Sequence, residues 1–276
     1  MSDFDYKRRR PGRGEPFTAA PARAVPPSQQ RQQEVRLFGI NACLAAFAAR
    51  PDDLRKVYLT EQRISAMKAV LAWCVKHRIG YRLVAEADVA KLAGSQHHEG
   101  VCFEMRRKPL LSLGELVADQ PEAPAASVLV VFDGVGNPHN FGAVLRSAAN
   151  FGVGGMILTA DAGLSLSGAA YRVAEGGAES VPLAKPQFGE NLVTQLREAG
   201  YAIAATVPTG GESLYANALP QRVAIVFGAE GSGMSDTLIA AADRRVTIPG
   251  TGQVESLNIA ASAAVLLAEH WRLTRG

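Results

Sequence analysis

Hydrophobic and polar positions alternate in blocks along the second half of the chain, and these blocks predict strands and helices in turn. The run VLVVFDG from Val128 is apolar almost throughout, which is typical of a strand buried in a parallel sheet. The stretch that follows predicts a turn and then a helix that ends at Gly152. Residues 256–273 predict a long final helix. Further strands are predicted at 154–159, 202–207, 223–231 and 245–250.

This alternation predicts an α/β fold, with helices packed on a mostly parallel sheet. Ligands of such sheets bind at the carboxyl ends of the strands, in the loops that lead into helices. We therefore expect the functional residues to lie in the loops that follow the predicted strands.

The first half of the chain predicts a smaller α/β unit over residues 35–108. Its expected helices begin near Ala42 and at residues 66 and 87, and its expected strands cover 56–60, 81–84 and 100–105. Residues 1–34 are basic and nearly free of apolar side chains, which predicts a disordered tail. Residues 109–126 contain three prolines and are predicted to be the linker to a second domain over 127–276.

Composition narrows the class of protein. At 276 residues, with 47% hydrophobic and 20% charged positions, the chain suits about two ordinary domains. No apolar run approaches the ~18–20 residues of a membrane span, and no apolar stretch follows the arginine-rich start as in a secretory signal. The 3 cysteines are widely spaced, which predicts neither a disulfide framework nor a metal site and favours the cytoplasm.

Charge is distributed unevenly along the chain. Residues 1–34 hold 7 Lys and Arg against 4 Asp and Glu, and residues 35–108 hold 13 against 7. Residues 109–276 hold 9 against 15, so the front is basic and the back acidic. A basic front predicts a polyanionic partner such as nucleic acid, whereas solvated helix faces are the alternative for any single residue.

Three loops at predicted strand ends are rich in glycine and small polar residues. They read NPHNFGAVLRSA from Asn137, FGAEGSGM from Phe227 and IPGTGQVESLN from Ile248. None of them is a dinucleotide fingerprint or a phosphate-binding P-loop, which disfavours a nucleotide-dependent oxidoreductase. No His or Cys cluster has the spacing of metal ligands, so no metal is predicted.

In their order and internal spacing, the three loops resemble the three motifs of the SpoU/TrmH family of RNA ribose 2′-O-methyltransferases, in the SPOUT superfamily. The GGAESVP stretch from Gly176 and the HHEGV stretch from His97 are also similar to segments of that family. The positions that match the motifs are Asn140, Gly142 and Arg146 in the first loop, Gly228, Glu230 and Gly233 in the second, and Ile248, Pro249, Gly252, Ser256, Leu257 and Asn258 in the third.

The resemblance implies S-adenosylmethionine as methyl donor, a trefoil knot in the C-terminal domain, and a homodimer with its active site near the interface. It also implies tRNA or rRNA as substrate, bound by a small substrate-binding domain over 35–108. A non-catalytic RNA-binding or ribosome-assembly factor with the same fold is the alternative.

The resemblance further implies roles for individual side chains. Arg146 is the implied catalytic arginine, although an arginine is a poor base, so the group that takes the proton stays open. Asn140 and Asn258 are implied site residues, and each has helix capping as its alternative. The remaining implied catalytic residues are Glu230 and Ser256; the alternatives are a loop carboxylate that accepts backbone N–H bonds for Glu230 and capping of the last helix for Ser256. The implied donor-binding residues are Gly228, Ile248 and Leu257, with core and turn positions as their alternative.

Basic side chains of the first domain form a candidate RNA-facing set, with exposed surface charge as the alternative for each. The set is Lys76, Arg78, Arg82, His97, His98, Arg106, Arg107 and Lys108.

Overall fold

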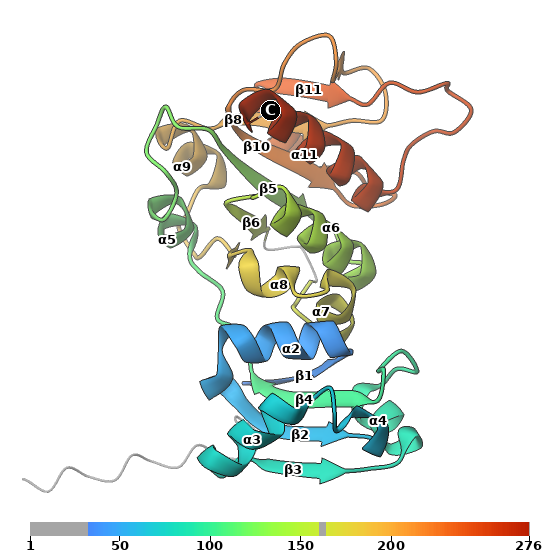
Figure 1. Ribbon diagram of the computed structural model, residues 1–276. Coiled ribbons are helices and arrows are strands. Elements are labelled where there is room, and N and C mark those ends of the chain that lie inside the picture. Colours follow the sequence, from blue (N-terminus) through green and yellow to red (C-terminus); the bar gives the residue numbers. More distant parts are fainter. Residues whose placement is uncertain (1–32, 160–163, 276) are drawn as a thin grey trace, which may run out of the picture.

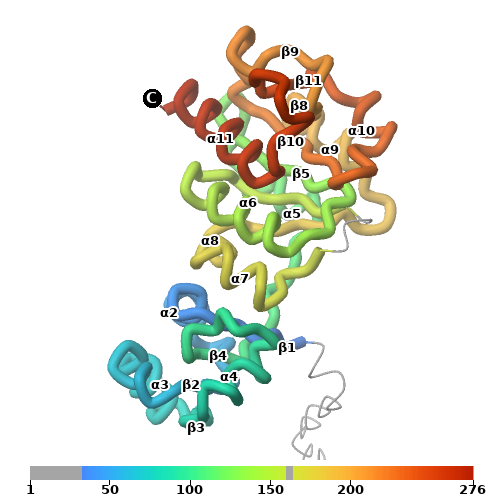
Figure 2. The backbone as a smooth tube through the Cα atoms, turned by 90° about the vertical axis from the view of Figure 1, so that its right-hand side faces the viewer, coloured from blue at the N-terminus to red at the C-terminus, as the bar shows by residue number. Residues whose placement is uncertain are grey.

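The computed structural model describes residues 33–159 and 164–275, which form two sheets surrounded by helices (Figure 1). The smaller, four-stranded sheet lies at one end of the molecule and the seven-stranded sheet at the other (Figure 2). The tail predicted over residues 1–34 lies outside the described residues, apart from its last two positions.

The smaller sheet has the strand order β1-β4-β2-β3. Strand β4 pairs antiparallel with β1 and β2, and β2 pairs parallel with β3 at the edge. The first strand was not predicted, because the short run EVRLF merges with the apolar start of the next helix. The strands are β1 (Glu34–Phe38), β2 (Leu54–Leu59), β3 (Gly80–Leu83) and β4 (Val101–Arg106), and the helices are α2 (Ile40–Ala49), α3 (Lys68–His77) and α4 (Glu86–Ala93).

The larger sheet has the order β7-β6-β5-β10-β8-β11-β9, and every pairing of its named strands is parallel. The prediction of a mostly parallel α/β sheet is therefore confirmed. Strand β5 is buried along its whole length, as its apolar run predicts. The strands are β5 (Ser127–Asp133), β6 (Gly155–Leu158), β7 (Leu183–Ala184), β8 (Ala202–Thr206), β9 (Glu212–Ser213), β10 (Arg222–Gly228) and β11 (Arg244–Thr247).

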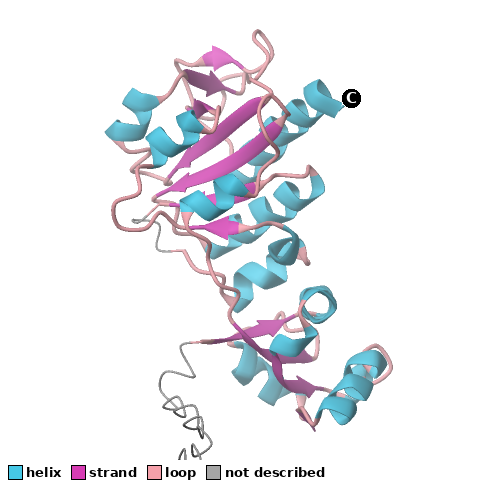
Figure 3. Cartoon of the chain, turned by 90° about the vertical axis from the view of Figure 1, so that its left-hand side faces the viewer, coloured by secondary structure: helices cyan, strands magenta, loops and turns pink. Residues whose placement is uncertain are grey.

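Helices cover both faces of the larger sheet (Figure 3). Alternate residues of β5 face opposite sides: Val130 and Phe132 pack in one core, and Leu129 and Val131 in the other. The first core is covered by α6 (Pro138–Asn150), α7 (Gly168–Ala174), α8 (Gly177–Ser180) and α11 (Ile259–Arg275). The second is covered by α5 (Leu113–Ala118), α9 (Leu192–Glu198) and α10 (Asp236–Ala241).

The stretch 109–126, predicted as a linker, contains helix α5. Ser112 begins the helix with a capping box, in which its hydroxyl accepts from the Glu115 amide and the Glu115 carboxylate accepts from the Ser112 amide. Leu113 and Leu116 are fully buried against the larger sheet. This part of the chain therefore contributes to the core as well as connecting the two sheets.

The two sheets share one continuous hydrophobic core, because β1 and α2 pack on α7 and α8 (Figures 1 and 2). Polar groups fasten the same boundary: the Arg50 guanidinium donates to both carboxylate oxygens of Glu179, at 3.0 and 3.1 Å, and to the Tyr171 hydroxyl at 3.3 Å. Gly168 has no room for a side chain, because a Cβ there would overlap the carbonyl oxygen of Arg36. The smaller sheet is thus held directly against the helices that follow the first motif.

Candidate active site

The three motif loops begin at the carboxyl ends of β5, β10 and β11. Because all three strands run parallel, these ends lie along one edge of the sheet. The first loop enters α6, the second enters α10, and the third crosses from β11 to α11. The fold therefore brings the first and second loops together, although they are about 90 residues apart in the sequence.

One side-chain amide links all three loops. The buried Asn140 donates from Nδ2 to Oε1 of Glu230 at 2.6 Å, and its Oδ1 accepts from Nδ2 of Asn258 at 3.1 Å. We call these three residues the Asn-Glu-Asn cluster. The cluster uses both ends of the Asn140 amide, so an aspartate or a leucine at this position could not replace it.

The capping alternative for Asn140 is wrong. Asn137 caps α6, because its Oδ1 accepts from the amide groups of His139 and Asn140, at 2.9 and 3.4 Å. Asn140 lies within the first turn, where its side chain is available for the cluster. Asn258 does both jobs: its Oδ1 accepts from the Ala260 amide at 2.9 Å at the start of α11, while its Nδ2 reaches Asn140.

The predicted start of the final helix at residue 256 is also wrong, since α11 begins at Ile259, directly after Asn258. Ser256 is an exposed loop residue in the third motif and does not occupy the capping position. Leu257 beside it is 48% exposed and Val254 is 70% exposed, so the third loop offers apolar surface to solvent. Ile248 packs instead against the core next to β11.

The second loop folds back on itself, which explains Gly228. Ala229 and Gly233 form a small bridge, each donating its amide to the other's carbonyl at 2.9 and 3.0 Å. A Cβ on Gly228 would lie within 2.5 to 2.8 Å of the Gly233 backbone, so no side chain fits there. This fold presents Glu230, which is exposed, toward Asn140.

Asp133, at the end of β5, holds this loop in place, and no sequence motif identified it. Its Oδ2 accepts from the Ser235 amide at 2.7 Å, and its Oδ1 accepts from the Thr159 hydroxyl at 3.2 Å. The side chain is buried at the end of β5. A carboxylate that ends a fully apolar strand was the signal that could have identified it, because a buried charge needs such partners.

Arg146 is separated from the cluster within one chain. It lies six residues after Asn140 on α6, which places it about 9 Å along the axis and on a different face. The exposed Arg146 lines an open hollow of about 640 Å³ between α6, α8 and the neighbouring α2. Glu175 lines the same hollow; hydrogen bonding from Asn41, together with the positive charges of Arg172 and Arg146, lowers the pKa of the Glu175 carboxyl.

The structure divides the candidate RNA-facing set. His98 is buried, and its Nδ1 accepts from the Gly100 amide at 3.0 Å, so it shapes a turn and does not face solvent. Lys108 is half-buried and donates to the carbonyls of Ala178 and Glu179, and burial lowers the pKa of its amine. The remaining members are exposed: Lys76, Arg78, Arg82, His97, Arg106 and Arg107.

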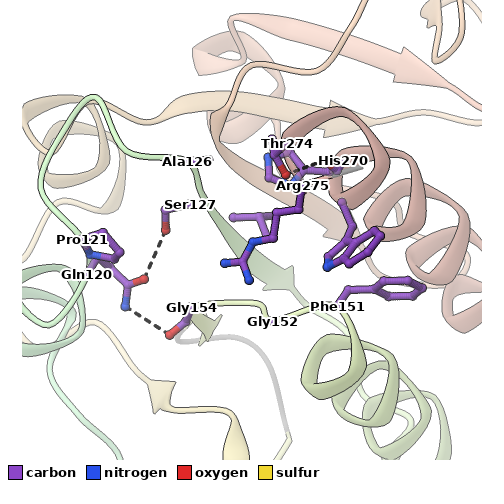
Figure 4. Close-up of a pocket in the computed structure, with 12 residues that line it drawn as sticks. Gln120, Pro121, Ala126, Ser127, Phe151, Gly152, Gly154, His270, Thr274 and Arg275 are labelled. Carbon is purple, nitrogen blue, oxygen red and sulfur yellow. Dashed lines mark hydrogen bonds between the residues drawn. The ribbon is translucent and has the colours of Figure 1, made fainter.

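A second, smaller hollow of about 90 Å³ lies near the start of β5, away from the motif loops (Figure 4). Gln120 donates there to the Gly154 carbonyl at 3.1 Å and accepts from the Ser127 hydroxyl at 3.2 Å. Arg275 and His270 reach it from α11 (Figure 4). These contacts anchor the connection between the two sheets and do not extend the candidate active site.

Comparison with known proteins matches both halves of the chain. Residues 127–268 match the SpoU rRNA Methylase family, and residues 36–110 match the family described as RNA 2'-O ribose methyltransferase substrate binding. The chain belongs to the SpoU rRNA methylase family. The family resemblance stated from the three motifs is thereby confirmed.

Relatives of this SpoU chain span most of its length. It is 38% identical to the uncharacterized tRNA/rRNA methyltransferase YfiF of Escherichia coli O157:H7, over 88% of this chain and 70% of the relative. It is 30% identical to the 23S rRNA (guanosine-2'-O-)-methyltransferase RlmB of Nitrosomonas europaea, over 86% of this chain and 90% of that protein.

Solved structures share the fold. A crystal structure of an RNA 2'-O ribose methyltransferase superimposes with a TM-score of 0.72 at 27% identity, over 90% of this chain and 91% of that one. An AdoMet-bound rRNA methyltransferase from Sinorhizobium meliloti superimposes with a TM-score of 0.74 at 20% identity, over 90% of each chain. In the part of the SpoU chain that the structure describes, no helix is both long and apolar enough to cross a membrane.

Proposed function

We propose that this protein is an S-adenosylmethionine-dependent methyltransferase that methylates a ribose 2′-hydroxyl of tRNA or rRNA. The observation that carries the proposal is the Asn-Glu-Asn cluster, in which three family motifs meet through the Asn140 side chain. In this account residues 35–108 bind RNA, and residues 127–276 bind the donor and carry the chemistry. The three cysteines are unpaired and buried, which supports a cytoplasmic location.

The open and apolar surroundings of the second and third loops support binding of the donor there. Beside Gly231, Gly233, Gly250 and Gly252, a Cβ would meet no described atom within 4 Å, so open space borders both loops. Backbone amide and carbonyl groups of such loops can bind an adenosine, and the exposed Leu257 supplies apolar surface beside them. We assign donor binding to Gly228, Ile248 and Leu257. When bound, the donor supplies an electrophilic methyl group on a sulfonium sulfur.

The chain's own residues would position the ribose and assist the loss of its proton. Oε1 of Glu230 is occupied by Asn140, and Oε2 makes no hydrogen bond to any described residue, so it can accept one from a ribose hydroxyl. The Arg146 guanidinium suits a backbone phosphate, which it can bind through two parallel N–H donors. Asn140 and Asn258 orient Glu230, and Ser256 offers a hydroxyl from the third loop. Holding the reactants in line supplies much of such a reaction's rate.

We propose that the protein acts as a homodimer in which Arg146 of one protomer completes the Asn-Glu-Asn cluster of the other. The support is geometric, because Arg146 and Asn140 occupy different faces of the same helix. A mixture of Arg146→Ala and Glu230→Ala chains tests this arrangement. Random exchange into mixed dimers would restore about one quarter of the wild-type sites, whereas a site built within one chain would stay inactive in every dimer.

We also propose that the segment from β11 to α11 passes through a loop to form a trefoil knot. The support is the topology: β11 lies near one edge of the sheet, yet α11 packs across the first core against α6. Threading of this kind is a rare exception to the rules of chain connection, so it rests on the family and not on the sequence pattern.

The experiment that tests the proposed function maps 2′-O-methylated riboses in RNA from cells with and without the gene. A 2′-O-methyl group protects the adjacent phosphodiester from alkaline cleavage, so each lost modification appears as a newly cleaved position. Loss of a defined site, restored by the wild-type gene and not by an Arg146→Ala gene, is the expected result. An unchanged pattern, together with RNA binding by the purified protein, would favour a non-catalytic RNA-binding factor.

A further inference from the structure

The positive charge of the smaller domain is concentrated in one part of it. Residues 54–84, which run from β2 through α3 to β3, hold 7 Lys and Arg against 1 acidic residue. The rest of residues 35–108 holds 6 against 6 and is therefore neutral. The whole net charge of the domain lies on this β2–α3–β3 unit.

The lysine and arginine side chains of this unit differ from those in the rest of the domain in whether they form ion pairs. Four of the 6 bases elsewhere in the domain form ion pairs: Arg36, Arg50, Lys91 and Arg106. None of the 7 bases between residues 54 and 84 pairs with a carboxylate of the described residues. Their charge is thus not neutralised by the protein itself.

Stabilisation of helix α3 does not explain why lysine and arginine occupy these positions. Lys76 and Arg78 lie at the end of α3, where the helix dipole favours positive charge. Lys68, however, begins the same helix, where the dipole disfavours it, and no acidic residue lies in that first turn. Lys68 and Lys76 are eight residues apart, so both project from one exposed face of α3. The positions of these lysine and arginine side chains are therefore better explained by binding of a negatively charged ligand than by stabilisation of the helix.

An exposed aromatic side chain lies within this basic region. Strand β3 forms the edge of the sheet and is exposed at every position. Tyr81 on this strand is 44% exposed, and the exposed Arg82 follows it on the opposite face of the strand, so the two side chains flank the edge. The strand lies at the end of the molecule farthest from the larger sheet (Figure 1). We call Lys68, Lys76, Arg78, Tyr81 and Arg82 the β3-edge surface.

We propose that the β3-edge surface binds a single-stranded segment of RNA. Its lysine and arginine side chains contact the phosphates, and Tyr81 stacks on an unpaired nucleobase. The inference rests on the proposed function, since it takes RNA as the substrate. Lysine and arginine side chains neutralise phosphates without reading sequence, and an exposed aromatic ring stacks on a base that is not already stacked in a duplex. The surface lies far from the Asn-Glu-Asn cluster, so it would hold a part of the RNA distant from the methylated ribose.

The first test measures binding of a fluorescein-labelled, mixed-sequence RNA of 20 nucleotides to the full chain at several salt concentrations. Two phosphate contacts removed from a single strand should flatten the slope of log affinity against log salt by about 1.4. We expect this for a Lys76→Gln/Arg82→Gln variant. The control is Arg36→Gln/Lys91→Gln, which removes the same charge from the same domain at ion-paired positions outside the candidate RNA-facing set and should leave the slope nearly unchanged. Equal slopes for both variants would overturn the inference.

The second test uses Tyr81. Tyr81→Ala should weaken binding of the single strand about tenfold with an unchanged salt slope, while Tyr81→Phe should retain it. Binding of the same sequence annealed to its complement should not respond, because its bases are already stacked. An equal loss for both RNAs would overturn the stacking role.

Methyl transfer, measured in parallel, separates this inference from the proposed function. If wild type transfers methyl groups and all β3-edge variants bind RNA like wild type, the inference fails and the function stands. If wild type binds RNA through this surface but transfers no methyl group to any RNA, the proposed function fails instead.

Discussion

The amide nitrogen of Asn140 lies 2.6 Å from a carboxylate oxygen of Glu230, although the two residues are 90 positions apart in the chain. The bond joins the entrance of α6 to the loop after β10. Because Asn258 donates to the other end of the same amide, the position of Glu230 depends on all three motif loops. The cluster is therefore a test of whether the loops act as one site.

Asn140→Asp removes the donor to Glu230 and places two carboxylates side by side. We expect a rate at least about tenfold lower, because a hydrogen bond to a charged group is worth about 1.5–3 kcal/mol. The control is Asn137→Ala, which removes the cap of α6 and should lower the free energy of unfolding by about 1 kcal/mol without displacing Glu230. A rate loss as large for Asn137→Ala would mean that the effect is only one of helix stability.

Arg146→Ala should lower the rate of methyl transfer about 10²–10⁴-fold, because it removes a group that activates and positions the substrate. Donor affinity should stay close to wild type, since Arg146 lies outside the second and third loops. Single-turnover rates and calorimetric titration with S-adenosylmethionine measure the two quantities separately. A wild-type rate would show that Arg146 has no part in the reaction.

The sequence predicted the mostly parallel sheet, the motif loops and their place at the strand ends, because the positions of strands and loops follow from local patterns; it did not predict the order of the strands. It could not predict which side chain caps α6, since Asn137 and Asn140 are both near the helix start and only the backbone path chooses between them. It also placed His98 and Lys108 with the exposed basic side chains, although His98 is buried beside the Gly100 amide and Lys108 donates to the Ala178 carbonyl, 70 residues away. Tertiary burial of this kind leaves no mark in the local sequence.

Gly142 illustrates a motif residue whose role is packing. A Cβ at this position would lie 2.6 Å from the Ala170 carbonyl and 2.8 Å from Cβ of Val173, so α6 and α7 approach closely only with glycine there. Gly142→Ala should lower the free energy of unfolding by about 1–3 kcal/mol. The control is Gly136→Ala, where a Cβ has open space. Denaturant titration of both variants compares the two effects, and equal stabilities would contradict the packing account.

His270 should make the stability of the protein depend on pH. It is buried on α11, and desolvation lowers the pKa of its imidazole below the ordinary value of about 6.5, despite a hydrogen bond with the Gln221 carbonyl at 3.1 Å. The unfolded chain therefore binds more protons as the pH falls below about 6.5, and stability is lost in that direction.

Urea unfolding at pH 7.5 and 5.5, at one protein concentration, measures this loss. Wild type should lose more stability between the two values than His270→Gln, which cannot be protonated. The titrating carboxylates are common to both proteins and cancel in the comparison. An equal loss in the two proteins would exclude His270 as a source of the pH dependence.

The most direct test of the account supplies the purified protein with S-adenosylmethionine labelled in its methyl group and with total RNA from cells that lack the gene. After complete digestion of the RNA, chromatography separates 2′-O-methylated nucleosides from base-methylated ones. The account predicts label in a 2′-O-methylated nucleoside with wild type, and none with Arg146→Ala. Label on a base, or no transfer by a protein that binds both the donor and the RNA, would contradict it.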